Sequence, residues 1–290
     1  MKNIIDCIGN TPLVEIQHLN PYSNVNIYAK LEGNNPGGSV KDRAALNMIQ
    51  SAMERGDIKK GTRLIEATSG NTGIALAMIA GIYDLQIELV MPANSTRERT
   101  LTMEAFGAQV TLLETIEECR DYAEQKGSGA DYFLVDQFSN KDNYKAHYKG
   151  TGPEIWRDTD QKITHFVSSM GTTGSIMGCS MFLKEQNPSI QIVGCQPTEE
   201  SSIPGIRRWP EEYLPKIYDP KRVDRIIDVS QNQATDMARQ LARREGIFVG
   251  MSSGGAFAAA LKLASEVKEA NIVFIACDRG DRYLSSDLFG

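Results

Sequence analysis

The sequence lacks the features that would tie it to a membrane, a secretory route or a nucleic acid. No apolar stretch reaches the roughly 18 consecutive residues that a membrane-spanning helix needs. The first residues carry none of the basic, apolar and small-residue regions of a signal peptide. The formal net charge of −6 disfavours binding to nucleic acid or to an anionic membrane. We therefore expect a cytoplasmic protein with neither kind of partner.

Cysteine and histidine are also scarce. The five cysteines are an odd number without a C-x-x-C pair, so they fit neither a disulfide framework nor a zinc cluster. The three histidines are scattered and show no metal-ligand spacing. The pattern predicts a reducing compartment and no metal site.

Strand-like and helix-like segments alternate through most of the 290 residues, which is enough for two lobes. Strands are expected at 63–67, 87–91, 110–113, 132–135, 163–168, 190–195, 225–229 and 272–277. Helices are expected at 71–81, 175–186, 234–244 and 256–267, with further helical stretches between the earlier strands. This alternation predicts an α/β fold in which helices cover both faces of mostly parallel sheets. A polar connection at 142–150 is the expected boundary between the lobes.

Ligands of such folds bind beyond the carboxyl ends of the strands, in loops that lead into helices. Three glycine-rich turns have this placement, at 68–73, 171–175 and 250–255. A proline-containing segment at 201–220 is expected to form a long irregular excursion, and loops of that length are often functional.

Lys41 follows a glycine-containing turn and begins an amphipathic helix, with Ser39 as the expected N-cap. A cation in the first turn of a helix is disfavoured by the macrodipole, so this placement suits a lysine that acts as nucleophile or base. An ordinary surface lysine is the alternative, but the three glycine-rich turns favour the functional interpretation.

The turn at 171–175 combines backbone N–H groups, hydroxyls and a helix start, which together suit a phosphate group. It is neither a Walker A loop nor a dinucleotide fingerprint. A plain capping turn is the alternative. The phosphate interpretation predicts a tightly bound phosphorylated cofactor rather than a nucleotide that is hydrolysed.

The turn at 68–73 is also rich in donors and suits the carboxylate of an amino acid, while Asn71 can reach an anionic oxygen on a bound ring. Here too a capping turn is the alternative. The third turn matches the G-x-S-x-G of a hydrolase around Ser252. A hydrolase of that kind needs a histidine after the serine, and the last histidine is His165, so we reject that interpretation.

Taken with the run Ile8–Val14, these segments resemble the cysteine synthase family of fold-type II pyridoxal-phosphate enzymes over nearly the whole chain. The resemblance implies a tryptophan synthase β-like fold with a smaller mobile lobe at 35–145 and a larger lobe at 1–34 and 146–290. It implies pyridoxal 5'-phosphate as cofactor and a homodimer. The resemblance implies that Lys41 forms the Schiff base with the cofactor, that Asn71 bonds the ring hydroxyl and that Ser252 lies at the pyridine nitrogen. The implied phosphate cup consists of Gly171, Thr172, Thr173, Gly174 and Ser175. The implied substrate-binding residues are Thr68, Ser69, Gly70, Asn71, Thr72 and Gln137.

Within the family, the segments 201–210 and 277–283 resemble the subgroup called type B, which accepts thiosulfate as well as sulfide. A dianionic sulfur donor needs cationic help, which Arg207 and Arg208 can supply. A solvated basic pair is the alternative. The resemblance also places Cys277 beside the site, where an inert buried thiol is an equally good interpretation.

The resemblance implies β-replacement on O-acetyl-L-serine: Lys41 removes the α-proton, acetate leaves, and sulfide or thiosulfate adds to give L-cysteine or S-sulfo-L-cysteine. Two half-reactions at one site predict ping-pong kinetics. One alternative keeps the cofactor and changes the reaction, to serine or threonine dehydration or to a cystathionine β-synthase type of activity. Another is a cofactor-binding scaffold without turnover that acts on a partner such as a serine acetyltransferase.

Overall fold

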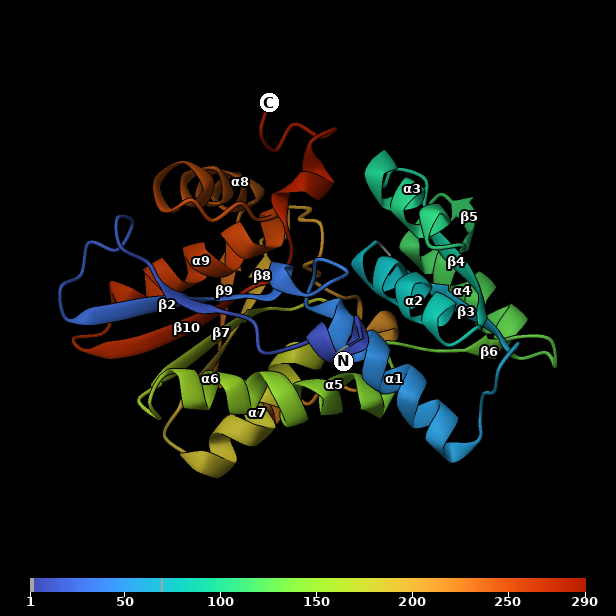
Figure 1. Ribbon diagram of the computed structural model, residues 1–290. Coiled ribbons are helices and arrows are strands. Elements are labelled where there is room, and N and C mark those ends of the chain that lie inside the picture. The colour runs from blue at the N-terminus through green and yellow to red at the C-terminus, as the bar shows by residue number, and fades with distance from the viewer. Residues whose placement is uncertain (1–2, 69) are drawn as a thin grey trace.

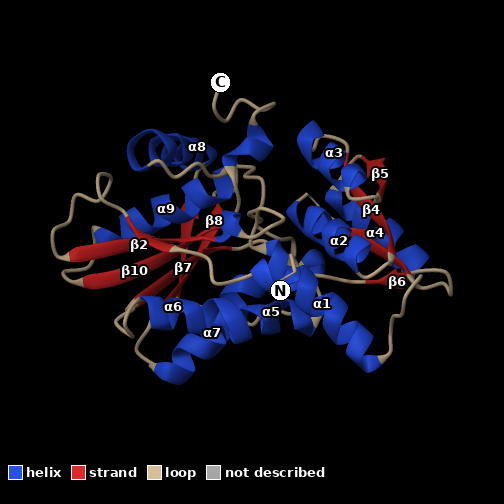
Figure 2. Cartoon of the chain, viewed as in Figure 1, coloured by secondary structure: helices blue, strands red, loops and turns tan. Residues whose placement is uncertain are grey.

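Two β-sheets organise the protein, whose computed structural model describes residues 3–68 and 70–290. Within the described residues, the larger sheet has the strand order β1-β2-β10-β7-β8-β9 and the smaller one β5-β4-β3-β6 (Figures 1 and 2). The larger sheet consists of β1 Leu13–Glu15, β2 Val25–Leu31, β7 His165–Ser169, β8 Gln191–Pro197, β9 Arg225–Val229 and β10 Ala270–Ala276. The smaller sheet consists of β3 Arg63–Ala67, β4 Gln86–Pro92, β5 Gln109–Leu113 and β6 Phe133–Leu134.

Helices cover both faces of the larger sheet, as expected for parallel strands (Figure 1). Helices α8 (Gln231–Gln240) and α9 (Met251–Ala264) share one apolar cluster with the strands, in which Phe257 and Phe274 have ring centroids 5.3 Å apart. Helices α6 (Gly152–Asp158) and α7 (Gly174–Gln186) pack on the other face. Only β1 is antiparallel to its neighbour among the described strand pairs, and it lies at the sheet edge.

The smaller sheet is covered in the same way. Helices α1 (Lys41–Arg55), α2 (Asn71–Ile82) and α3 (Arg97–Ala105) contribute to one apolar cluster, and α4 (Ile116–Gly127) packs on the opposite face. Helix α2 is apolar on nearly all sides because it lies between the sheet and its neighbouring helices, where it has no solvent-facing stripe.

The expected α/β architecture is confirmed, and every expected strand is present with ends that shift by a few residues. Strands β1 and β2 were not predicted, although the alternating burial of β2 is an ordinary strand pattern. Four helix starts differ from the expected ones. Helix α1 has Val40 rather than Ser39 at its N-cap, and α7 begins at Gly174 rather than 175. Helix α8 begins at Gln231 rather than 234, and α9 at Met251 rather than 256.

The expected boundary segment at 142–150 is helical. Helix α5 (Lys141–Ala146) continues through a π-helical turn, His147–Thr151, into α6. All four strands of the smaller sheet nevertheless lie within 35–145. No helix in the described ranges combines the length and apolarity that crossing a membrane requires.

Candidate active site

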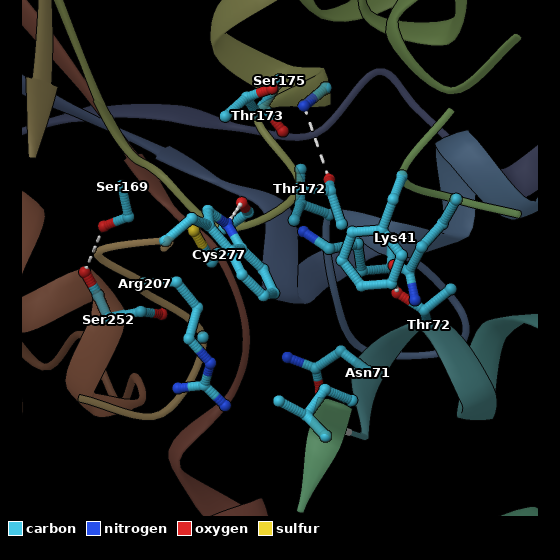
Figure 3. A pocket seen from close by; sticks show the side chains of 18 of the residues that line it. Lys41, Asn71, Thr72, Ser169, Thr172, Thr173, Ser175, Arg207, Ser252 and Cys277 are labelled. Atoms are coloured by element: carbon cyan, nitrogen blue, oxygen red, sulfur yellow. Dashed lines mark hydrogen bonds between the residues drawn. The ribbon is translucent and has the colours of Figure 1, made fainter. Parts of the chain in front are cut away.

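A cavity lies where the carboxyl ends of the two sheets face each other, and residues of both lobes line it (Figure 3). The hydroxyl-bearing Thr173 and Ser175 lie at one end, while Asn71 and Arg207 lie at the other. The lining residues that sequence analysis had named are Lys41, Asn71, Thr72, Gln137, Gly171, Thr172, Thr173, Gly174, Ser175, Arg207, Ser252 and Cys277. The structure therefore brings most of the expected site together from distant parts of the chain.

Backbone contacts between the start of α1 and the segment after β10 hold Lys41 at this cavity. The Val40 N–H donates to the Cys277 carbonyl oxygen at 2.8 Å, and Ser39 forms an isolated bridge with Asp278. The Ser39 hydroxyl accepts from the Lys41 N–H at 3.2 Å, so Ser39 shapes the turn although it is not the N-cap. These bonds join the start of α1 to the end of β10 and present the lysine side chain to the cavity.

A buried cluster of charges anchors the same helix two residues further on. The Arg43 guanidinium donates to both oxygens of Glu32, at 2.6 and 2.9 Å, and to both oxygens of Glu154, each at 2.7 Å. Lys30, whose side chain is fully buried, lies 2.9 Å from Glu154. Burial by itself would raise the pKa of Glu154, but the bonds from Arg43 and Lys30 lower it to about 2. The carboxylate is therefore ionised, and the cluster fixes α1 against β2 and α6.

The turn between β7 and α7 has the properties of an anion site. Thr173 precedes the helix with a left-handed φ of 69°, a strained conformation for a β-branched residue. Its Oγ1 atom is buried and has no hydrogen-bond partner among the described residues. The helix start adds N–H groups and the positive end of the macrodipole. A buried hydroxyl without a partner at such a place fits a phosphate group that would supply the missing acceptor.

The side chain of Asn143, on α5, holds the turn Gly171–Ser175 in place through hydrogen bonds. Its Nδ2 atom donates to the Gln137 carbonyl oxygen at 2.8 Å and to Thr172 Oγ1 at 3.3 Å. A Cβ atom on Gly174 would lie only 2.0 Å from Asn143 Oδ1, so glycine is required for this close approach. Asn143 was not among the expected site residues, because nothing in its local sequence separates it from other polar helix residues.

Asn71, at the start of α2, is held by residues of the segment after β10. Its Nδ2 atom donates to Asp278 Oδ2 at 2.7 Å, and its Oδ1 atom accepts from Arg282. The hydroxyl of Tyr283 donates to the same Asp278 oxygen at 2.7 Å. Asp278, Arg282 and Tyr283 therefore orient the amide of Asn71 at the edge of the cavity. The role of Asn71 as partner of a ring hydroxyl stays a prediction.

The segment 68–73, which leads into α2, contains residues that reach the cavity and residues that do not. Thr72 Oγ1 donates to Gln137 Oε1 at 2.7 Å, and both residues line the cavity. Thr68 Oγ1 instead accepts from the N–H groups of Gly70 and Gly73, each at 3.1 Å, which is the capping role weighed above as an alternative. Gly70 lies beside Arg99, with a φ of 143°. Ser69 lies outside the described residues.

Ser252 and Cys277 are distant in the sequence, but both line the cavity. The Ser169 hydroxyl donates to the Ser252 carbonyl oxygen at 2.7 Å, and the Cys277 N–H donates to Ser253 Oγ at 2.9 Å. Burial raises the pKa of the Cys277 thiol to about 12 despite the nearby Lys41. The thiol is therefore protonated at neutral pH. Within the described ranges, no histidine lines the cavity beside Ser252.

The side chains of the neighbouring residues Arg207 and Arg208 differ in location: one lines the cavity and the other lies on the surface. Arg207 lines the cavity, and its guanidinium donates to the carbonyl oxygen of the preceding residue, Ile206, at 3.3 Å. It forms no ion pair with a carboxylate among the described residues. Burial lowers the pKa of Arg207; the negative charge of Glu117 opposes this effect, and the positive charge of Arg99 adds to it. Arg208 is exposed and forms an ion pair with Asp228 at 2.9 Å, away from the cavity. An anion in the cavity would meet Arg207 and not Arg208.

Several lining residues were absent from the sequence-based site. They are Val40, Arg99, Ile116, Phe138, Ser169, Gly205 and Trp209. Trp209 Nε1 donates to the Gly171 carbonyl oxygen at 2.8 Å and so ties the irregular excursion to the phosphate turn. Trp209 belongs to the segment 201–210 that resembles type B enzymes, so the sequence could have identified it as a site residue. Nothing in the sequence around Arg99 indicates that it lines the cavity.

Comparison with known proteins agrees with this geometry. Residues 4–278 match the family model described as "Pyridoxal-phosphate dependent enzyme". The chain is 59% identical over 289 residues to "Cysteine synthase B" of Pseudomonas aeruginosa, covering 99% of this chain and 97% of that protein. It is 54% identical over 293 residues to "Cysteine synthase B" of Escherichia coli, covering 100% and 97%. The crystal structure of "Cysteine Synthase (OASS)" from Entamoeba histolytica superposes with a TM-score of 0.92 at 37% identity, covering 100% of this chain and 90% of that one.

Proposed function

Because this chain belongs to the cysteine synthase family of pyridoxal-phosphate-dependent enzymes, we propose that it makes L-cysteine by β-replacement on O-acetyl-L-serine. The observation that carries the proposal is one cavity that brings together Lys41, the phosphate turn Gly171–Ser175 and Ser252. These groups match the aldehyde, the phosphate and the pyridine nitrogen of the cofactor, and the unpartnered Thr173 hydroxyl fits its phosphate. The bound cofactor supplies an electron-withdrawing system that acidifies the α-hydrogen of the amino acid.

The residues of the chain have distinct roles in this proposal. Lys41 takes the α-proton and later returns it to the same carbon, so that its Nζ atom acts as base and then as acid. Thr72, in the first turn of α2, and Gln137 would bind the substrate carboxylate, and the Ser252 hydroxyl would bond the ring nitrogen of the cofactor. Acetate leaves before the sulfur donor adds, and walls from both lobes limit the access of water between these events.

We place the sulfur donor beside Arg207. A partly buried guanidinium with no carboxylate partner among the described residues suits the dianion thiosulfate, as well as the smaller hydrosulfide ion. Arg208 gives a matched control, because it is the neighbouring residue, has the same side chain and is bound to Asp228.

The test supplies O-acetyl-L-serine with sulfide or with thiosulfate and measures acetate and the sulfur-containing product. In Arg207→Ala we expect kcat/KM for thiosulfate to fall about 10- to 100-fold, the usual range for a lost charge-assisted hydrogen bond, with a smaller loss for sulfide. Arg208→Ala should retain both activities. Pyruvate formed from serine without a sulfur donor would favour the dehydratase alternative, and cystathionine formed from homocysteine the cystathionine β-synthase alternative. Equal losses in the two variants would contradict the role of Arg207.

The smaller lobe, 35–145, closes over the bound amino acid in this proposal. Its contribution to the cavity includes Asn71 and Thr72, whereas the phosphate turn belongs to the larger lobe. Closure would bring the two sets together and exclude water. Crystal structures with and without a bound amino acid provide the test: we expect Thr72 to move toward Gly171, and identical positions in both structures would contradict closure.

The proposed setting is a homodimer in the cytoplasm. The family resemblance supports the dimer, and light scattering of the purified protein measures its mass directly. The described cysteines are all free, in keeping with a reducing compartment.

A further inference from the structure

A buried histidine lies behind the phosphate turn and is not among the cavity-lining residues. His147 is 1% exposed. Its Nδ1 atom lies 2.9 Å from Thr151 Oγ1, and its Nε2 atom lies 3.3 Å from Ser175 Oγ. Ser175 is a member of the phosphate turn at the start of α7. The imidazole therefore connects a threonine inside the protein to a hydroxyl at the cavity.

The backbone brings this histidine into place in an unusual way. His147 begins the π-helical turn His147–Thr151, and single π-helical turns within α-helices are frequent at functional sites. Gly178 on α7 permits the contact, because a Cβ atom there would lie 2.0 Å from the Tyr144 carbonyl oxygen and 2.7 Å from His147 Cβ. The two helices thus approach closely enough for the ring to reach Ser175.

The imidazole is neutral in these surroundings. Burial lowers the pKa of His147 well below its usual range, and the positive charges of Arg43 and Lys41 lower it further, while Glu154 acts in the opposite direction. A neutral imidazole has one N–H donor and one acceptor nitrogen. Its two neighbouring hydroxyls therefore cannot both donate to it or both accept from it.

The two tautomers have opposite consequences for the phosphate turn. With the proton on Nδ1, the ring donates to Thr151, and Nε2 accepts the Ser175 proton, so that Ser175 offers an anion only its lone pairs. With the proton on Nε2, Thr151 donates to Nδ1, and the ring donates to Ser175 Oγ. The Ser175 O–H then remains available as a donor, which is what a phosphate requires.

We propose that His147 is a positioning residue for cofactor binding: as the Nε2–H tautomer, whose Nδ1 atom accepts from Thr151, it directs the Ser175 hydroxyl proton toward the cofactor phosphate. The inference rests on the cofactor site of the proposed function but not on the identity of the amino-acid substrate or the sulfur donor. The two hydrogen bonds that link Thr151, His147 and Ser175 connect the π-helical turn to the cavity, and the proposal gives this network a role in cofactor binding.

The test measures the dissociation constant of pyridoxal 5'-phosphate from apoprotein by fluorescence titration. In His147→Leu we expect the dissociation constant to rise about tenfold, the effect of one hydrogen bond to a charged group. His147→Gln, whose amide nitrogen can donate to Ser175, should recover most of the affinity. In a Ser175→Ala background, His147→Leu should cause no further loss, because the histidine acts only through that hydroxyl. A merely structural histidine would give additive losses and no rescue by glutamine.

A second pair of variants removes or keeps the hydroxyl that bonds Nδ1. Thr151→Val leaves Nδ1 without a hydrogen-bond partner, so the ring is held less firmly toward Ser175 and cofactor binding should weaken, whereas Thr151→Ser keeps the hydroxyl and should bind like the wild type. If wild-type apoprotein fails to bind pyridoxal 5'-phosphate, the proposed function is wrong. If the wild type binds and the His147→Leu and Thr151→Val variants bind equally well, only the role of His147 is wrong.

Discussion

Replacing Lys41 by alanine should abolish turnover, with a loss of more than about a thousandfold in kcat, because the same amine binds the cofactor and transfers the α-proton. The structure gives the cavity no substitute for it: Lys41 is the only lysine among the described lining residues. The assay follows acetate release from O-acetyl-L-serine in the presence of sulfide. Lys60→Ala provides a control, because that side chain is 80% exposed and forms an ion pair with Asp84 on the surface.

The variant should still fold and should still bind the phosphate of the cofactor, because the turn Gly171–Ser175 lies on a different element. A Lys41→Ala protein with unchanged secondary structure and bound cofactor but no turnover would separate catalysis from folding. Turnover close to that of the wild type would remove the basis of the proposed mechanism.

The second large effect is on stability. Arg43→Leu should lower the free energy of unfolding by about 3–5 kcal/mol, because it leaves the carboxylates of Glu32 and Glu154 buried without their main partner. Glu32 is fully buried, and the side chain of Glu154 is 8% exposed. Denaturant unfolding monitored by circular dichroism measures the change.

Arg55→Leu is the matched control, since it makes the same substitution on the same helix. Arg55 is 47% exposed, its partner Asp57 is exposed as well, and its buried partner Asp142 keeps an ion pair with Lys145 at 3.0 Å, so the loss of Arg55 should cost less than about 1 kcal/mol. Similar destabilisation by both substitutions would show that the buried cluster does not anchor α1, and the explanation for the position of Lys41 would have to change.

The fold and the centre of the site were predictable because they depend on local patterns. The strands are short apolar runs, and the turn Gly171–Ser175 concentrates glycine and hydroxyl residues between a strand and a helix. Lys41 and Ser252 were also accessible, since each follows a glycine-containing turn and begins a helix. Such features can be read in a window of a few residues, and their order along the chain supports the family resemblance.

The remaining contacts depend on residues that meet only in three dimensions. The amide of Asn71 bonds Asp278, which is 207 positions away, and no local pattern indicates that pair. Arg207 and Arg208 are equivalent in the sequence, yet one lines the cavity and the other pairs with Asp228 on β9. His147 looked like an isolated histidine, because the π-helical turn that aims it at Ser175 has no simple sequence signature.

The most direct test of the central claim is to reduce the cofactor-loaded protein with borohydride, digest it and map the modified peptide by mass spectrometry. Reduction converts a lysine–cofactor imine to a stable secondary amine, so the site of attachment can be read from the fragment masses. We expect a single phosphopyridoxyl group, on Lys41. Modification of a different lysine, or none in protein that contains the cofactor, would contradict it.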